Sequence, residues 1–359
     1  MLELNKQKYK DFDWVLMGVS AAIFIAGLSF LFSAMASQNM DFVIRQAVWF
    51  LIGALLFIVL ININYRKIIS LGYALYFLTV ILLLVVFFFG SKRLGAQRWL
   101  EIGNFNLQPS EFAKLFITLA LIQYLTGHKE GKGVRHIVSA FFIMFLPFLL
   151  ILAQPDLGTA LMLVPVFFAL LYIWGARLKH LLFMIGGGIL LSPLAWFLLK
   201  DYQKERLMVF MNPNIDPLGA GYTVIQSRIA IGSGGVFGKG WLSGTQNQLN
   251  FLTERHTDFI FSVAGEEWGF IGGIILIALY FILVKRAFDI ARKTDDPCGV
   301  LAACGMAVII GIQAVVNISM TMGFMPVVGL PLPLVSYGGS SLLVTMIALG
   351  MLESIAIHR

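Results

Sequence analysis

The sequence predicts an all-α membrane protein with ten transmembrane helices and both termini on the cytoplasmic side. The 359 residues are 59% hydrophobic and only 13% charged, and the mean hydropathy is +0.86. Soluble domains are about 45–50% apolar and about 25% charged. This composition excludes a soluble globular protein, a disordered chain and a disulfide scaffold. The net charge of +7 is expected in cytoplasmic loops, so we expect no nucleic acid partner.

Ten apolar runs are long enough to cross a bilayer, since one span needs about 20 residues. They cover residues 14–34, 47–63, 71–90, 111–126, 137–153, 157–175, 180–199, 259–284, 299–323 and 339–357. Residues 1–359 are therefore expected to form a single polytopic membrane domain. The sequence Ala34-Met-Ala36 resembles a signal-peptidase site, but the run before it is long for a signal peptide, so we expect an uncleaved first span.

The positively charged residues predict the orientation of these spans. The termini and alternate loops carry fifteen of them, namely Lys6, Lys8, Lys10, Arg66, Lys67, Lys129, Lys132, Arg135, Arg177, Lys179, Lys285, Arg286, Arg292, Lys293 and Arg359. The opposite short loops carry Arg45, Lys92, Arg93 and Arg98. Because cytoplasmic loops are enriched in lysine and arginine, the first set is predicted to face the cytoplasm.

Two segments on the extracytoplasmic side are unusual. A long loop between spans seven and eight, about residues 200–258, carries six cations: Lys200, Lys204, Arg206, Arg228, Lys239 and Arg255. Loops of this length are uncommon without a function. Residues 324–338, between spans nine and ten, are uncharged but contain three prolines, which cannot sit in one regular helix. This segment is either an ordinary interfacial loop or, as we favour, a re-entrant segment that floors an external cavity.

Charged residues at the ends of the spans mark candidate sites, because a charge at the bilayer centre costs about 2.5–3.5 kcal/mol on insertion scales. Glu111 and Lys114 open span four with i,i+3 spacing and can therefore pair. They form either a helix cap with a neutralising ion pair or the polar wall of an external site. Asp156 opens span six, where an acid can cap the helix or line the same site.

Span eight combines two acids with a stripe of glycines. At least one of Glu266 and Glu267 should point into the bundle or at a partner, since both cannot face lipid cheaply. Gly265, Gly269 and Gly273 recur every four residues, which lets another helix approach closely. This stripe serves either internal packing or the docking of a partner's transmembrane helix.

The long external loop contains two sequences that suggest chemistry. The glycine-rich residues 231–240 fail the Walker A pattern, because Ser233 and Gly240 stand at required positions, and they fail the dinucleotide pattern at Phe237. We interpret them as a flexible turn in which Lys239 can meet an anion. The sequence Thr253-Glu-Arg-His-Thr-Asp258 precedes span eight, and Asp258 is either a helix cap or a carboxylate for acid/base work on a hydroxyl. No nucleophile motif and no dedicated metal cage is present in the sequence.

Several motifs together resemble the SEDS family, whose members include RodA, FtsW and SpoVE. They are Gly95-Ala-Gln-Arg-Trp-Leu100, Gln108-Pro-Ser-Glu-Phe-Ala-Lys114, Gln154-Pro-Asp-Leu-Gly-Thr159, Asp216-Pro-Leu-Gly-Ala-Gly-Tyr222, Gln226-Ser-Arg-Ile-Ala-Ile-Gly-Ser-Gly-Gly235, Gly238-Lys-Gly-Trp241, Glu254-Arg-His-Thr-Asp-Phe259 and Pro331-Leu-Pro-Leu-Val-Ser-Tyr-Gly-Gly339. They occur in order from about residue 95 to residue 350. The stretch ending at Gln246 and the one ending at Asp258 look most similar to the RodA branch.

The resemblance implies a peptidoglycan glycosyltransferase that polymerises lipid II during cell elongation. Lipid II is a disaccharide-pentapeptide on undecaprenyl pyrophosphate, and its polymerisation takes place on the outer face of the bacterial cytoplasmic membrane. The expected partners are a class B penicillin-binding protein and membrane lipids. The resemblance assigns catalytic importance to Asp258, Glu111 and Lys114.

The resemblance also implies an inverting single displacement, because the donor sugar is α-linked and the product is β-1,4-linked. Asp258 would then take the proton of the acceptor hydroxyl. The leaving pyrophosphate needs positive charge, for which the candidates are Arg98, Arg228, Lys239, Arg255 and Lys114, and Asp156 is a further candidate substrate-binding residue. No cofactor is certain, although a divalent cation such as Mg²⁺ could assist.

Two other functions fit the same hydropathy pattern. A transporter, including a lipid II flippase, shares the ten spans and the intramembrane charges, but transporters tend to bind substrates at the midplane between repeats. A scaffold for a penicillin-binding protein would need the glycine stripe and not Asp258. The concentration of polar residues at one face favours the glycosyltransferase.

Overall fold

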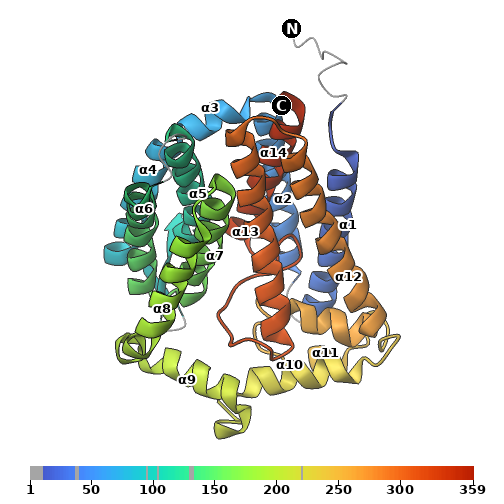
Figure 1. Ribbon diagram of the computed structural model, residues 1–359. Coiled ribbons are helices and arrows are strands. Elements are labelled where there is room, and N and C mark those ends of the chain that lie inside the picture. Colours follow the sequence, from blue (N-terminus) through green and yellow to red (C-terminus); the bar gives the residue numbers. More distant parts are fainter. Residues whose placement is uncertain (1–10, 37–39, 94–95, 103–104, 129–132, 220) are drawn as a thin grey trace.

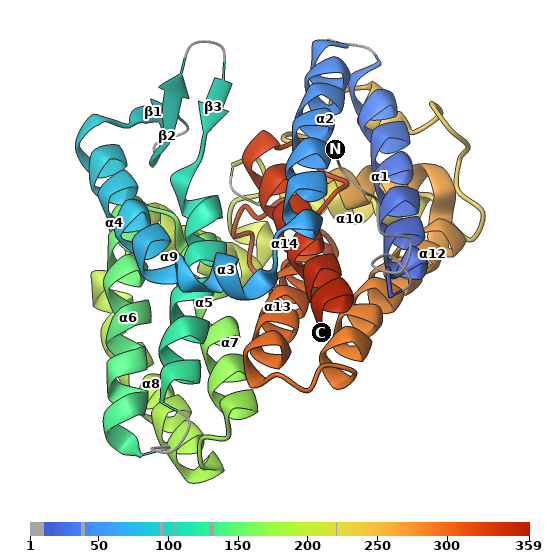
Figure 2. The same cartoon turned by 90° about the horizontal axis from the view of Figure 1, so that it is seen from above.

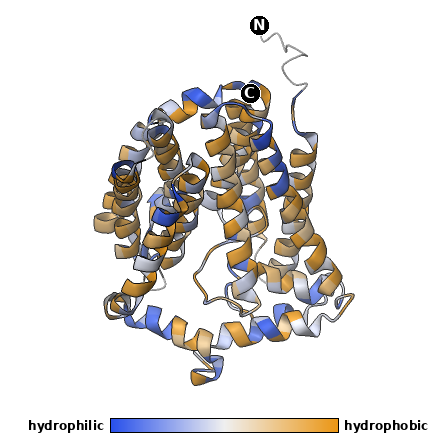
Figure 3. Ribbon diagram, in the orientation of Figure 1, coloured by the Kyte–Doolittle hydropathy of each residue, from blue (hydrophilic) through white to orange (hydrophobic). Residues whose placement is uncertain are grey.

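The computed structural model is a mostly helical bundle, described here for residues 11–36, 40–93, 96–102, 105–128, 133–219 and 221–359. The start of α1 (Trp14–Met35) and the end of α14 (Gly339–His358) lie on one side of the bundle, and α9 (Asp201–Met211) and α10 (Tyr222–Ser233) lie across the opposite side (Figure 1). Hydrophobic residues dominate the long helices, and hydrophilic ones gather near the two ends and on the crossing helices (Figure 3). Lys6, Lys8, Lys10, Lys129, Lys132 and Gly95 lie outside the described residues.

The helices and strands follow one another in the order expected of spans joined by short connections. The helices are α1 (Trp14–Met35), α2 (Asp41–Asn62), α3 (Tyr65–Ser70), α4 (Gly72–Phe89), α5 (Pro109–Gly127), α6 (Val134–Ala153), α7 (Leu157–Trp174), α8 (Leu178–Leu198), α9 (Asp201–Met211), α10 (Tyr222–Ser233), α11 (Thr245–Gln248), α12 (Ile260–Arg292), α13 (Pro297–Thr321) and α14 (Gly339–His358). A 3-10 turn, η1, covers Pro213–Ile215, and the strands are β1 (Ser91–Arg93), β2 (Ala96–Ile102) and β3 (Phe105–Leu107).

Eight of the described helices are long and apolar enough to cross a membrane, namely α1, α2, α4, α6, α7, α12, α13 and α14. The chain is therefore a multi-pass membrane protein. The two other expected spans correspond to α5 and α8. In α5 the polar residues Glu111, Lys114 and Gln123 interrupt the apolar pattern, and the described apolar stretch of α8 is Leu178–Leu194.

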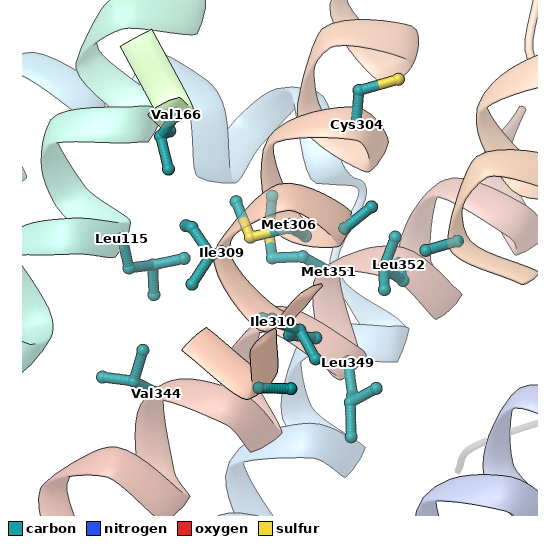
Figure 4. Close-up of a cluster of buried hydrophobic side chains, with 14 of the residues drawn as sticks. Leu115, Val166, Cys304, Met306, Ile309, Ile310, Val344, Leu349, Met351 and Leu352 are labelled. Carbon is teal, nitrogen blue, oxygen red and sulfur yellow. The ribbon is translucent and has the colours of Figure 1, made fainter. Parts of the chain in front are cut away.

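The helices form two groups that meet along α5, α7 and α13. Helices α4 to α8 lie in one group, and α1, α2, α12, α13 and α14 lie in the other (Figure 2). The contact between the groups is apolar and buried, and it includes Leu115 of α5, Val166 of α7, Ile309 of α13 and Val344 of α14 (Figure 4). Because lipid is as apolar as these side chains, close van der Waals packing is what holds such an interface together.

A small sheet is the one departure from the expected all-α fold among the described residues. Strands β1, β2 and β3 form a three-stranded antiparallel sheet in the connection between α4 and α5. The hydropathy pattern did not predict it, because the strands are only three to seven residues long. The sheet bears on the candidate site because β2 carries Arg98.

The long external loop is largely helical rather than extended. Helices α9, α10 and α11 occupy most of it. The glycine-rich turn packs against α12 through two of its glycines. A Cβ at Gly234 or Gly238 would collide with the backbone of α12 near Glu266 and Glu267.

This turn covers a break in α12. Gly269 has φ 66° and ψ −162°, so the helix is interrupted there. The backbone groups freed by the break bond to the turn: Phe270 N–H donates to Gly235 O at 2.9 Å, and Glu267 O accepts from Gly240 N at 3.0 Å. Non-helical backbone in a membrane protein needs such internal partners.

The glycine stripe is consequently occupied by the chain itself. A Cβ at Gly265 would meet Ile231, and one at Gly269 would meet Gly238. Gly273 is also buried, beside the ring of Phe261. The arrangement favours internal packing over the docking of a partner helix at Gly265 and Gly269.

The residues 324–338 run without a helix between α13 and α14, as their prolines predict. Leu330, Leu332 and Val335 are buried, whereas Phe324 and Met325 at the start of the segment are exposed. Side chains of two helices, α13 and α2, hold the backbone: Gln313 donates to Pro331 O at 2.8 Å, Asn317 donates to Leu330 O at 2.7 Å, and Gln46 donates to Ser336 O at 3.0 Å. The second half of the segment is thus packed inside protein, which is the condition for irregular backbone within a bundle.

Candidate active site

The sequence Thr253-Glu-Arg-His-Thr-Asp258 is held between α13 and the irregular residues 324–338. Asn317 donates to the carbonyl oxygen of Asp258 at 3.0 Å, and Ser336 donates to that of Thr257 at 2.5 Å. Tyr337 N–H donates to His256 O at 2.8 Å. Glu254 has φ 49°, a conformation that side chains rarely adopt and that tends to persist at functional sites.

Asp258 lies where two cavities meet. The larger cavity, of about 490 Å³, is lined on one side by Arg98, Glu111 and Tyr202 and on the other by Asp258 and Tyr337. The smaller cavity, of about 240 Å³, lies between α9, α10 and the start of α12. The carboxylate receives no hydrogen bond from the rest of the described chain, so its oxygens are available to a substrate hydroxyl.

The environment of Asp258 suits a general base. Burial is the main cause that raises the pKa of Asp258 to about 6, and the neighbouring Glu254 raises it further, while Arg206 and Arg98 oppose this increase. A carboxylate with a pKa of about 6 is still mostly ionised at neutral pH, and it is a stronger base than an ordinary aspartate. The helix-cap alternative is weaker, because Phe259 is the N-cap of α12 and that cap makes no side-chain hydrogen bond.

Arg98 and Asp156 form a buried unit at the edge of the larger cavity. Asp156 caps α7 through Thr159 N–H, accepts from Ser110 at 2.8 Å, and pairs with Arg98 at 3.7 Å. Arg98 also donates to Pro155 O. Arg98 faces the cavity and Asp156 does not line it, so Asp156 acts by holding Arg98.

Glu111 and Lys114 form the expected ion pair beneath this cavity. Their charged atoms are 2.9 Å apart and both side chains are buried. Lys114 also donates to Gln313 at 2.7 Å, and Gln313 in turn holds Pro331. Glu111 lines the cavity. Lys114 connects Glu111, through Gln313, to the irregular residues 324–338.

Two of the expected phosphate-binding cations point elsewhere. Lys239 pairs with Glu266 at 2.8 Å, and Glu266 also accepts from the backbone of Gln246 and Asn247. Arg255 is buried and donates to Asn247 O. Neither cation lines the two cavities beside Asp258, so both stabilise the external loop. Arg228, by contrast, lines the smaller cavity, as expected of a substrate-binding residue.

Sequence reasoning missed Arg206, which lines both cavities from α9. Burial and the nearby Arg98 lower its pKa. In the sequence it is one of six cations in a long loop, and no local pattern separates it from Lys204. Tyr202 and Glu205, on the same helix, also line the larger cavity, and no local pattern in the sequence marks them.

The acids around Asp258 do not form a metal site. Over the described part of the chain, no group of three or more histidine, cysteine or acidic residues could hold a metal ion. The described residues therefore offer no all-protein cage for a metal ion, and no step of the chemistry is assigned to Mg²⁺.

Comparisons with known proteins show which family the chain resembles. A family model described as cell cycle protein, which represents FtsW, RodA and SpoVE, matches residues 11–359. The chain is 40% identical over 363 residues to the peptidoglycan glycosyltransferase MrdB of Escherichia coli K12, covering 99% of this chain and 97% of that protein.

Two solved structures have the same fold. One is a chain in a peptidoglycan synthase complex that coordinates polymerisation and crosslinking, with a TM-score of 0.83, 38% identity, and coverage of 96% of this chain and 97% of that chain. The other is RodA of Thermus thermophilus, with a TM-score of 0.73, 33% identity, and coverage of 96% of each chain. The motifs, the fold and these similarities lead to one conclusion: the chain belongs to the FtsW/RodA/SpoVE family, the SEDS family.

Proposed function

We propose that this protein is a peptidoglycan glycosyltransferase of the bacterial inner membrane that polymerises lipid II during cell elongation and cell-shape maintenance. The observation that carries the proposal is the position of Asp258, whose carboxylate has no partner in the described part of the chain. It lies at the junction of two cavities with Arg98 and Arg206 beside it. Two cavities at one base suit a reaction that joins two large substrates. The relative from Escherichia coli is named as such an enzyme.

In the proposed reaction, Asp258 accepts the proton of the acceptor 4-hydroxyl. At the same time the oxygen of that hydroxyl attacks C1 of the donor sugar. The bond from C1 to the pyrophosphate oxygen breaks, and the configuration at C1 inverts in this single displacement. Positioned positive charge stabilises the leaving pyrophosphate. In this proposal the polyprenyl chains of the two substrates lie along the apolar surface around α8.

We also propose the finer topology on which this reaction depends. Helices α5 and α8 complete ten spans, both termini face the cytoplasm, and residues 324–338 re-enter the membrane to floor the external cavity. The burial of that segment and the charges of the loops support this arrangement. The active site then faces the extracytoplasmic side, where a class B penicillin-binding protein can crosslink the product.

The test is polymerisation of purified lipid II in detergent by wild type and by Asp258→Asn, each with and without the cognate penicillin-binding protein. We expect glycan strands from wild type and none from Asp258→Asn. Full activity in Asp258→Asn would exclude the base role. Absence of strands from every wild-type sample, with partner and Mg²⁺ present, would favour transport or scaffolding.

A further inference from the structure

Arg206 occupies a central position that the proposed reaction has not yet used. Its side chain lines the two cavities that meet at Asp258 and also a third, of about 60 Å³, between α7 and α9. The third cavity is mostly apolar, with Leu157, Leu161 and Leu207 in its wall. Arg206 therefore lies between the two cavities beside Asp258 and a small, mostly apolar cavity.

The guanidinium of Arg206 is partly buried and has no carboxylate partner among the described residues. It donates to Val327 O at 3.1 Å, and no carboxylate lies within 4.0 Å of it in the described part of the chain. Lys114, Lys239 and Arg98, by contrast, all pair with an acid. A guanidinium carries five N–H donors, so most of those of Arg206 remain for a ligand.

The nearby Arg98 strengthens the case for an anionic ligand. Arg98 is close enough to Arg206 to lower its pKa by repulsion. Two guanidinium groups that repel each other at a partly buried site are stabilised when an anion lies between them. Planar guanidinium groups match the oxygen geometry of phosphates, often with two hydrogen bonds each.

We propose that Arg206 is a catalytic residue that binds the diphosphate of the prenyl-linked sugar donor, with Arg98 beside it. This inference deepens the proposed glycosyl transfer and rests on it. When the bond from C1 to the diphosphate oxygen breaks, the electron pair stays on that oxygen, and the leaving prenyl diphosphate gains one negative charge. The proton from the acceptor passes to Asp258. Arg206 neutralises the charge that develops on the leaving group.

The experiment compares Arg206→Gln and Arg206→Lys with Lys204→Gln, a matched control on the same helix. Lys204 lines none of the cavities described and pairs with the exposed Asp201 at 4.0 Å. Lipid II polymerisation is measured with the full-length protein and its penicillin-binding partner. The affinity for farnesyl diphosphate is measured by calorimetry in detergent, and farnesol serves as the probe for the prenyl chain alone.

We expect Arg206→Gln to lower kcat by about 100-fold or more, as when one donor to a developing anion is removed. Its Kd for farnesyl diphosphate should rise about tenfold or more, while farnesol binding is unchanged. Arg206→Lys keeps the charge but loses the fork, so its activity should be intermediate. Asp258→Asn should bind farnesyl diphosphate at least as tightly as wild type, because a nearby negative charge is removed.

Two results would overturn the inference. One is an Arg206→Gln protein as active as Lys204→Gln; the other is a folded Arg206→Gln or Arg206→Lys protein whose affinity for farnesyl diphosphate is that of wild type. The proposed function fails separately. If wild type makes no glycan but binds farnesyl diphosphate through Arg206, the diphosphate site stands and the glycosyl transfer does not.

Discussion

At the scale of single residues, the chemistry of the site depends on the protonation of Asp258. Its carboxylate must be ionised to accept a proton, and burial together with Glu254 raises its pKa to about 6. Activity should therefore be lost as the pH falls through about 6 and should be largely complete above neutral pH. The charges of Glu254 and Arg206 act on this pKa in opposite directions.

The substitution Glu254→Gln tests this electrostatic account. Removing the like charge should lower the pKa of Asp258, so the acidic midpoint of the kcat/KM profile moves to lower pH. Asp201→Asn is the matched control, because Asp201 is fully exposed and lines none of the cavities described. The profile of lipid II polymerisation against pH provides the measurement. An identical midpoint in wild type and Glu254→Gln would contradict the assignment.

The buried pair of Glu111 and Lys114 makes a second prediction at this scale. Lys114→Met leaves the carboxylate of Glu111 buried without its partner, which typically costs about 3–5 kcal/mol. The double variant Glu111→Gln, Lys114→Met removes both charges and should recover most of the thermal stability. Its polymerisation activity should stay low, since Glu111 lines the larger cavity. A single variant that unfolds at the wild-type temperature in detergent would refute this prediction.

At the scale of elements, the break in α12 determines how the external loop is attached to the bundle. The turn of residues 231–240 bonds to the backbone on both sides of Gly269. Glu266, just before the break, holds Lys239 and the start of α11. A continuous helix would leave these loop groups without partners, so the break and the loop stabilise each other.

Gly269→Ala should destabilise the protein strongly. The φ and ψ of Gly269 lie in a region that is essentially restricted to glycine, and such strain costs about 1–3 kcal/mol. The added Cβ would also lie 2.3 Å from the backbone nitrogen of Gly238. Gly273→Ala is the control from the same stripe, because its Cβ would make an ordinary contact of 3.6 Å with Phe261.

The measurement is the midpoint of thermal unfolding in detergent for both variants. We expect a clear decrease for Gly269→Ala and a value close to wild type for Gly273→Ala. Equal midpoints would show that the glycine conformation is not needed. Loss of partner binding in Gly273→Ala without a change in stability would instead support the docking role of the stripe.

At the scale of the whole molecule, the two ends of the bundle differ in charge and in structure. At the end with the termini, Arg286 of α12 pairs with Asp13, which caps α1, at 2.6 Å. The backbone of Asp13 also donates to Glu353 of α14 at 3.1 Å. The opposite end carries the crossing helices α9 and α10 (Figure 1), and residues of these helices line the cavities beside Asp258. Under the proposed topology, ion pairs therefore stabilise the cytoplasmic end, and the cavities beside Asp258 lie on the other side.

Labelling of single cysteines tests this orientation. In a background with Cys298→Ala and Cys304→Ala, we expect Leu218→Cys to react with a membrane-impermeant maleimide in intact spheroplasts, since Leu218 is 88% exposed. Asp295→Cys, in the connection between α12 and α13, should react only after the membrane is permeabilised. The opposite pattern would invert the topology and place the cavities in the cytoplasm.

The sequence by itself determined the helical membrane architecture, because hydropathy is a local property that about 20 consecutive residues express together. It also located the loop that carries Asp258, through residues adjacent in the chain. Glu111 and Lys114 pair as their i,i+3 spacing predicts.

Which cations face the cavities is evident only from the folded chain. Lys239 is turned away by its pair with Glu266, whereas Arg98 is held at the cavity by its pair with Asp156. The partners in each pair lie far apart in the chain. Arg206 faces the cavities, and no acid of the described chain pairs with it. The sheet that carries Arg98 and the break at Gly269 were likewise evident only in the folded chain. The direction of a loop side chain depends on long-range contacts, and hydropathy and spacing carry no information about them.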